Sequence, residues 1–210
     1  MKLNRKIIGV KKVNAKGLIQ GKRNERRKMQ KINVEKYNPQ WQVEFERAKL
    51  FYEKLLVGID KRIEHVGSTS VIGLWAKPVL DIDIIVKNSD DSLQVITKLS
   101  SAGYKHAGNL GLEGREAFKY DDTNLNINWM KHHLYVCLDG TKHLENHLLL
   151  RKHLRNNKES VRLYSELKIK LASEFSEDIT SYIDGKTELI TKFLSVEGMK
   201  KSKLEKIEKV

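Results

Sequence analysis

Two spacings of apolar residues alternate along this chain, and each predicts a different element. Residues 79–86 are almost entirely apolar and β-branched, which is typical of a buried strand, and their only charges are Asp81 and Asp83. A helix is predicted from Asn38, a suitable N-cap, with Pro39 in its first turn. Apolar residues then follow at helical spacing, and we expect them to face the core: Trp41, Phe45, Ala48, Tyr52, Leu55 and Leu56.

The rest of the pattern predicts helices and strands in turn. The stretch from Arg62 to the strand at 79–86 reads as a strand, a tight turn and a short helix. Further on we expect a helix at 91–102, a short strand at 104–107, a glycine-containing loop at 108–114, a strand at 116–120, a turn at 121–122 and a strand within 126–138. Helices are predicted at 141–157, 159–174 and 177–195. This order predicts an α/β (α+β) fold in which the last three helices form a layer beside the sheet.

Charge divides the chain into three parts. The net charge is +13, but residues 1–32 hold twelve Lys and Arg against one Glu, and residues 198–210 hold five Lys against two Glu. The body, 33–197, is therefore nearly neutral. We expect 1–32 to be a flexible basic arm and 198–210 a Lys-rich tail that is too small to pack firmly. The favoured interpretation of the arm is a solvated tail, and contact with nucleic-acid phosphates is the alternative.

Cysteine usage and hydropathy restrict the setting of the protein. Cys137, the single cysteine, lies in an apolar strand and excludes an internal disulfide, which fits a reducing cytoplasm. No apolar run is long enough to span a membrane, and the basic N-terminal region lacks the apolar stretch of a secretory signal. We expect a cytoplasmic protein with no membrane contact.

Candidate chemistry lies in residues 62–86. Because strand side chains alternate, Asp81 and Asp83 share one face, where two neighbouring carboxylates call for a cation. Their oxygen atoms suit Mg²⁺ or Mn²⁺, particularly when phosphates complete the coordination shell. The turn before this strand has Gly67 followed by three hydroxyl residues, Ser68, Thr69 and Ser70, and its amides and hydroxyls suit a phosphate. Together the two features favour metal-assisted phosphoryl or nucleotidyl transfer.

These residues also resemble a known superfamily. Gly67-Ser68 followed by Asp81-x-Asp83 is similar to the signature of polymerase-β-like nucleotidyltransferases. The longer string from His65 to Asp83, HVGSTSVIGLWAKPVLDID, resembles the hallmark of the GrpB-like family of small bacterial proteins, and the resemblance extends from about Val34 over most of the chain. It implies a nucleotidyltransferase-like mixed sheet flanked by helices.

The resemblance also implies site residues outside this string. Arg115, after the glycine-rich loop, and Lys186, one turn after Tyr182, match family positions that suit phosphate contact, and Lys77 precedes the aspartate strand. Each of these three is about as well explained as a solvated surface charge. His147 and Arg151 resemble the family's helix after the last strand, although Lys152 stands where Asp is usual.

A third metal-binding carboxylate is not identified by the sequence. Glu116, Asp121 and Asp122 are candidates. The family usually has a His-x-His pair on the last strand, where this chain has His133-x-Tyr135, and tyrosine is a poor Mg²⁺ ligand. His133 is an alternative ligand or substrate contact, or a structural histidine.

Two other motifs are set aside. His143 and His147 are four residues apart, but without the H-E-x-x-H pattern or a cysteine cluster they do not favour zinc. Gly185-Lys186-Thr187 lacks the leading glycine of a P-loop, since Thr180 stands in its place.

The resemblance therefore implies transfer of a nucleoside monophosphate from an NTP to an unknown acceptor. Asp81 and Asp83 would bind Mg²⁺, Gly67 and Ser68 would hold the β- and γ-phosphates, and Arg115 and Lys186 would neutralise developing charge. One alternative is a nucleotide- or RNA-binding module with a degenerate catalytic site, and another is an antibiotic- or toxin-modifying enzyme that shares the motif.

Overall fold

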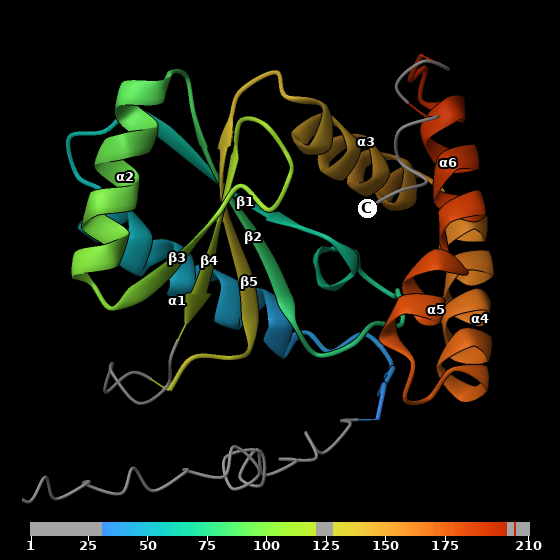
Figure 1. Cartoon of the computed structure of the whole chain (residues 1–210). Coiled ribbons are helices and arrows are strands. Elements are labelled where there is room, and N and C mark those ends of the chain that lie inside the picture. The colour runs from blue at the N-terminus through green and yellow to red at the C-terminus, as the bar shows by residue number, and fades with distance from the viewer. Residues whose placement is uncertain (1–30, 121–127, 201–203, 205–210) are drawn as a thin grey trace, which may run out of the picture. The chain divides into compact units, whose positions relative to one another are not determined.

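A five-stranded mixed sheet organises the protein, for which we analysed a computed structural model. It describes residues 31–120, 128–200 and 204, and from Lys31 the chain forms one compact unit. The strands lie in the order β1-β2-β5-β4-β3 (Figure 1), with β2 and β5 parallel and the other neighbours antiparallel. Their bounds are β1 (Lys61–Val66), β2 (Leu80–Val86), β3 (Tyr104–Gly108), β4 (Arg115–Tyr120) and β5 (His132–Leu138).

Six α-helices and one short 3-10 helix accompany the sheet in the described residues. They are α1 (Gln40–Leu55), η1 (Ser68–Ser70), α2 (Ser89–Ser101), α3 (Lys142–Asn156), α4 (Lys158–Glu174), α5 (Ile179–Asp184) and α6 (Thr187–Val196). The side chain of Asn38 accepts a hydrogen bond from the Gln40 amide, in agreement with the predicted start of α1. The predicted α/β class with a mixed sheet is confirmed.

The main core lies between one face of the sheet and helices α1 and α2. On β2, Ile82, Ile84 and Val86 point into this core, as their alternation with the aspartates predicts. The apolar stripe of α1 meets them, with Trp41, Phe45, Ala48 and Tyr52 all buried. Burying one such side chain contributes about 1.5–3 kcal/mol, so this layer fixes the direction in which the opposite face of β2 points.

The opposite face of the sheet is covered by α3. Ile85 and Cys137 pack there against Leu144 of α3. The predicted C-terminal layer corresponds to α3 together with α4, α5 and α6: α3 contacts both α4 and α6, and Figure 1 shows α4, α5 and α6 gathered on one side of the sheet. The layer also holds the turn after β1, since Leu74 packs with Leu154 and Phe193.

Two details of the C-terminal prediction are wrong. Residues 177–195 form two helices rather than one, with a break at Gly185 and Lys186. Gly185 follows the last residue of α5 and lies against α4, where a Cβ would come within 2.5 Å of a terminal methyl group of Leu171. Within the predicted tail, Met199 and Leu204 are buried against Leu194, so this part of the segment packs. Among the described residues, no helix combines the length and the apolar character that crossing a bilayer requires.

Candidate functional site

The two aspartates of β2 lie on the sheet face that α3 covers. Across the sheet, Asp83 is flanked by Glu64 of β1 and Tyr135 of β5, and Asp81 is flanked by His133 of β5. Their shared face is therefore the one opposite the main core, as strand alternation predicts. The core fixes this orientation, because shifting the register by one residue would bury both carboxylates among aliphatic side chains.

Asp83 is fully buried and holds a histidine. Its Oδ2 lies 2.7 Å from Nδ1 of His147, which comes from α3, while its Oδ1 has no hydrogen-bond partner. Burial lowers the pKa of His147, but the hydrogen bond and the charges of Asp83 and Asp81 outweigh it, so the net pKa is raised. An unpartnered, buried carboxylate oxygen is costly, and a cation would relieve that cost.

Asp81 lies against the turn that follows β1. Gly67 has a φ of 66°, and a Cβ at this position would lie 2.1 Å from Oδ2 of Asp81. Only glycine therefore lets the turn approach the carboxylate this closely. The sequence predicted that the Gly-Ser turn lies beside the aspartate strand, and the structure places Gly67 against Asp81.

The turn differs from the predicted phosphate cradle in one respect. It holds a single 3-10 turn at Ser68–Ser70, too short to present a helix N-terminus to an anion. Thr69 lies 3.0 Å from Nε2 of His65, and Ser70 donates to the carbonyl of Gly67. Both hydroxyl side chains are buried and serve the turn itself, so Gly67 and Ser68 are the members of this turn that line a cavity.

His65 has a structural role that the sequence reasoning did not assign. Its ring stacks on Phe45 of α1 with centroids 4.6 Å apart, and it contacts Thr69 in the turn. Burial lowers its pKa to about 4, so the ring is neutral near pH 7. Its place at the start of the family-like string was the available signal.

A cavity of about 280 Å³ lies beside Asp81. Arg151 lines it and is held by Glu64 of β1, with Nη1 2.8 Å from Oε2, and it also donates to the carbonyl of His65. On the other side, Tyr164 and Ser68 line the cavity together. The full lining is Gly67, Ser68, Asp81, Asn146, His147, Leu150, Arg151, Leu154, Tyr164, Lys186, Ile190 and Leu194.

Two lysines approach this region around one aromatic ring. Lys186 lines the cavity, and its Nζ lies 4.5 Å from the ring centroid of Tyr182, while Nζ of Lys77 lies 5.5 Å from the same centroid. Burial, then the charge of Lys77, lowers the pKa of Lys186 to about 8, against the opposing effect of Asp81. Burial also lowers the pKa of Lys77. Both predicted lysines thus sit near the aspartate, and an anion would stabilise their charged forms.

The predicted third carboxylate is not where the sequence placed it. Glu116 is paired with Val136 across β4 and β5, on the core face of the sheet, and its Oε2 lies 2.7 Å from Nε2 of His106. It points away from the aspartate pair, so this candidate is wrong. Asp121 and Asp122 lie outside the described residues.

The carboxylate that does face the pair is Glu64. It was not a candidate, because only the β1–β2 register brings it beside Asp83, and it is already paired with Arg151. On the β5 side, Nδ1 of His133 lies 3.4 Å from Oδ1 of Asp81, and burial, then the charge of Asp81, raises the pKa of Tyr135. Within the described residues, no three His, Cys, Asp or Glu side chains are grouped closely enough to hold one metal ion together.

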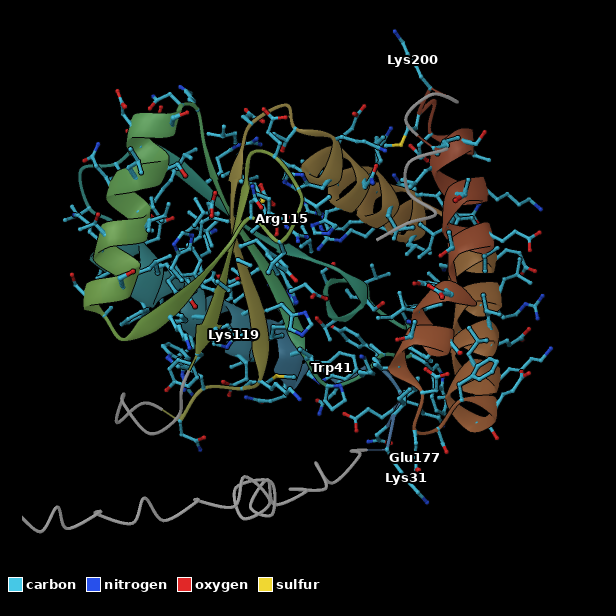
Figure 2. The ribbon with its side chains drawn as sticks, viewed as in Figure 1. Lys31, Trp41, Arg115, Lys119, Glu177 and Lys200 are labelled. Carbon is cyan, nitrogen blue, oxygen red and sulfur yellow. The ribbon has the colours of Figure 1, made fainter. Side chains whose placement is uncertain are left out.

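Arg115 lies in a second cavity rather than beside Lys186. Figure 2 shows Arg115 at the end of β4 nearer α3, with Lys119 toward the other end of the strand. Its guanidinium lies 4.6 Å from the ring centroid of Tyr135 and lines a cavity of about 660 Å³. Asn146 and His147 line both cavities, so the two are neighbours across α3. The expectation that Arg115 and Lys186 act on the same group is not supported by this placement.

Comparison with known proteins identifies the family. Residues 31–195 match the family described as GrpB protein. This chain belongs to the GrpB family. A relative, the UPF0157 protein YqkA of Bacillus subtilis (strain 168), is 32% identical over 164 residues, which are 76% of this chain but 45% of that protein. The crystal structure of conserved protein GrpB from Enterococcus faecalis aligns with a TM-score of 0.67 and 30% identity, covering 83% of this chain and 98% of that one.

A more distant likeness places this GrpB chain among nucleotidyltransferase-like folds. A crystal structure of the Cid1 poly(U) polymerase aligns with a TM-score of 0.52 at 13% identity, covering 75% of this chain and 49% of that chain. At this identity the likeness shows a shared fold and carries no activity with it.

Proposed function

We propose that this protein is a Mg²⁺-dependent nucleotidyltransferase that transfers a nucleoside monophosphate from an NTP to an acceptor. The observation that carries the proposal is the contact between Asp81 and Gly67, which puts a carboxylate beside a Gly-Ser turn in one cavity. Asp81 and Asp83 would hold Mg²⁺ or Mn²⁺, and the unpartnered Oδ1 of Asp83 fits such an ion. When bound, the ion would neutralise phosphate charge and align the reacting groups.

The chain's own residues would do the remaining work. The amide of Ser68 and the open backbone at Gly67 would receive the β- and γ-phosphates, and Lys186, with Lys77 behind it, would balance their charge. An acceptor oxygen would attack the α-phosphorus as the bond from that phosphorus to the bridging oxygen breaks. Pyrophosphate would leave, and the acceptor's proton would pass to solvent.

Nucleotide binding tests the proposal directly. Calorimetry with each NTP and Mg²⁺ should detect binding to the wild-type chain. The affinity of Asp81→Asn should be at least tenfold lower, since that change removes one negative charge from the side chains that would hold the ion. Asp90→Asn is the matched control, because Asp90 is exposed at the start of α2. Affinity that Asp81→Asn leaves unchanged would contradict the proposal. Incubation with α-labelled NTP, Mg²⁺ and cell extract would then report the labelled acceptor.

A nucleotide-binding module without catalysis is the second candidate. Two nearby carboxylates favour it because they already have partners and are less available to a catalytic metal ion. Glu64 forms a salt bridge with Arg151, and one oxygen of Asp83 is hydrogen-bonded to His147. The two candidates differ in outcome, because a module of this kind binds NTP yet labels nothing and releases no pyrophosphate. The basic segment 1–32, which lies outside the described residues except for Lys31 and Ile32, can be tested for nucleic-acid retention by deleting residues 1–30.

A further inference from the structure

A second cavity opens beside the proposed nucleotide site, where the loop before β4 meets the start of α3. It measures about 660 Å³, a size that accommodates a small molecule. Glycines with positive φ, Gly111 and Gly114, bring the loop backbone to its edge. The full lining is Gly111, Leu112, Glu113, Gly114, Arg115, Leu138, Thr141, Lys142, His143, Asn146 and His147.

Arg115 is a buried cation without an anionic partner. It is 9% exposed, its Nε has no hydrogen-bond acceptor, and among the described residues no carboxylate forms a salt bridge with it. The contact that the structure gives its guanidinium is the face of Tyr135, 4.6 Å away. A buried guanidinium is costly unless its donors are satisfied, and its planar fork matches phosphate and carboxylate oxygens.

The start of α3 adds a second source of positive potential. The helix runs for 15 residues from Lys142, and its N-cap, Thr141, makes no side-chain capping bond because its hydroxyl donates to the carbonyl of Leu138. Thr141 therefore does not cap the first-turn amides, which have no partner within the helix backbone. They carry the partial positive charge of the helix end toward the cavity that Arg115 lines.

Two acidic side chains lie near this helix end. Glu113 is exposed in the cavity lining, and Glu145 lies in the first turn of α3 but is not part of the lining, so Arg115 is the buried charge that faces the cavity. Burial, then the charges of Arg115 and His147, lowers the pKa of His143 to about 4, so its ring is neutral near pH 7 and can contribute a hydrogen bond to a ligand but no charge.

We propose that this cavity binds the acceptor of the transfer reaction by an anionic group, a phosphate or a carboxylate, held by Arg115 and the first turn of α3. The assignment of the ligand as acceptor rests on the proposed function, whereas anion binding does not. Asn146 and His147 line both cavities, so a molecule anchored at Arg115 reaches the wall of the nucleotide site. The buried Oδ1 of Asn146, which has no donor, suits a ligand hydroxyl. The acceptor is thus a small hydroxylated anion.

Anion binding can be located by NMR titration of the full chain with inorganic phosphate, and separately with acetate, in the absence of Mg²⁺. We expect saturable amide shifts at Gly114, Lys142 and His143 with at least one of the two anions, and the anion that binds more tightly identifies the group. Arg115→Gln should weaken this binding at least tenfold, and Arg115→Lys, which keeps the charge but loses the fork, by less. The matched control is Arg162→Gln, an exposed arginine on α4.

The outcomes separate the two proposals. Shifts confined to Gly67 and Ser68, or no saturable shift with either anion, would overturn the anion site, and the wild-type titration alone decides this even if an Arg115 variant does not fold. Binding that Arg115→Gln leaves intact would overturn it as well. Failure of Asp81→Asn to reduce NTP binding contradicts the transfer reaction instead, and it leaves anion binding at Arg115 standing as a separate result.

Discussion

The carboxylate of Asp81 lies so close to Gly67 that a Cβ on the glycine would sit 2.1 Å from Oδ2. Gly67→Ala must therefore displace either the turn or the aspartate, and alanine also resists a φ of 66°. We expect a loss of about 1–3 kcal/mol in the free energy of unfolding. We also expect loss of Mg²⁺-dependent NTP binding, measured by calorimetry.

Gly73→Ala is the matched control for this change. Gly73 has a φ of 83°, but a Cβ there would meet no atom within 4 Å. Gly73→Ala should therefore lose stability because alanine resists a positive φ, as at Gly67, but it should still bind NTP. If both variants bind NTP equally well, the close approach of Gly67 and Asp81 has no part in binding.

Nucleotide affinity should depend on pH through Lys186. Its pKa of about 8 means that the side chain loses its positive charge as the pH rises through that value. NTP affinity should therefore fall between pH 7 and pH 9, by at most about tenfold per pH unit. Lys186→Arg keeps a charge throughout this range, so its affinity should stay flat. Calorimetry of both chains at matched ionic strength checks this, and parallel pH profiles would exclude Lys186 as the titrating contact.

The free energy of unfolding should decrease at acidic pH, and His65 is one cause. Its pKa is about 4 in the folded chain, below the ordinary value of 6.5, so between these values the unfolded chain binds the extra proton. Stability should be fully present above about pH 6.5 and should fall as the pH drops toward 4, by on the order of 2–3 kcal/mol from this group. His65→Gln should reduce that slope in urea unfolding series but not remove it, because burial also lowers the pKa of His143 to about 4. His106→Gln, at an exposed histidine on β3, should leave the slope unchanged.

Lys168 should be a source of instability. It is 2% exposed on α4, its Nζ has no hydrogen-bond partner, and it rests 4.5 Å from the ring centroid of Tyr164. Burial, then the charge of Lys186, lowers its pKa well below the ordinary value, so keeping it charged costs free energy. Lys168→Met should raise the free energy of unfolding by about 1–4 kcal/mol.

Urea unfolding at neutral pH measures this effect. Lys170→Met, at an exposed position two residues along the same helix, should change stability by less than about 0.5 kcal/mol. A destabilised Lys168→Met variant would show that the ammonium group is satisfied by an interaction other than the contact with Tyr164.

Much of the fold follows from local sequence because two elements carry strong signals. The aliphatic residues of β2 alternate with Asp81 and Asp83, and the apolar stripe of α1 begins one turn after Asn38. These patterns fix which face of β2 is buried, and therefore where the aspartates point. The proximity of the Gly67 turn to Asp81 follows from the pairing of β1 with β2, which puts Val66, the residue before Gly67, opposite Asp81.

The errors in the predicted site concern residues whose position depends on strand pairing and helix packing rather than on local sequence. Glu116 and Arg115 are adjacent in sequence, yet strand alternation sends Glu116 to the core face and Arg115 to the site face, and only the β4–β5 register settles which is which. The contact between His147 and Asp83 joins residues 64 positions apart, and helical spacing within α3 does not predict it. The break between α5 and α6 falls at Gly185 and Lys186, and the helical spacing of apolar residues over 177–195 does not reveal it.

Helix α3 has a consequence for how the two cavities work together. Along its length it holds Asp83 through His147, β1 through Arg151 and the 3-10 turn through Arg155, which donates twice to the carbonyl of Ser70. A ligand that tilted this helix from the Arg115 side would therefore disturb three contacts around the nucleotide site together. By thermodynamic reciprocity, if that ligand changes the affinity for the nucleotide by some factor, the nucleotide changes the affinity for that ligand by the same factor.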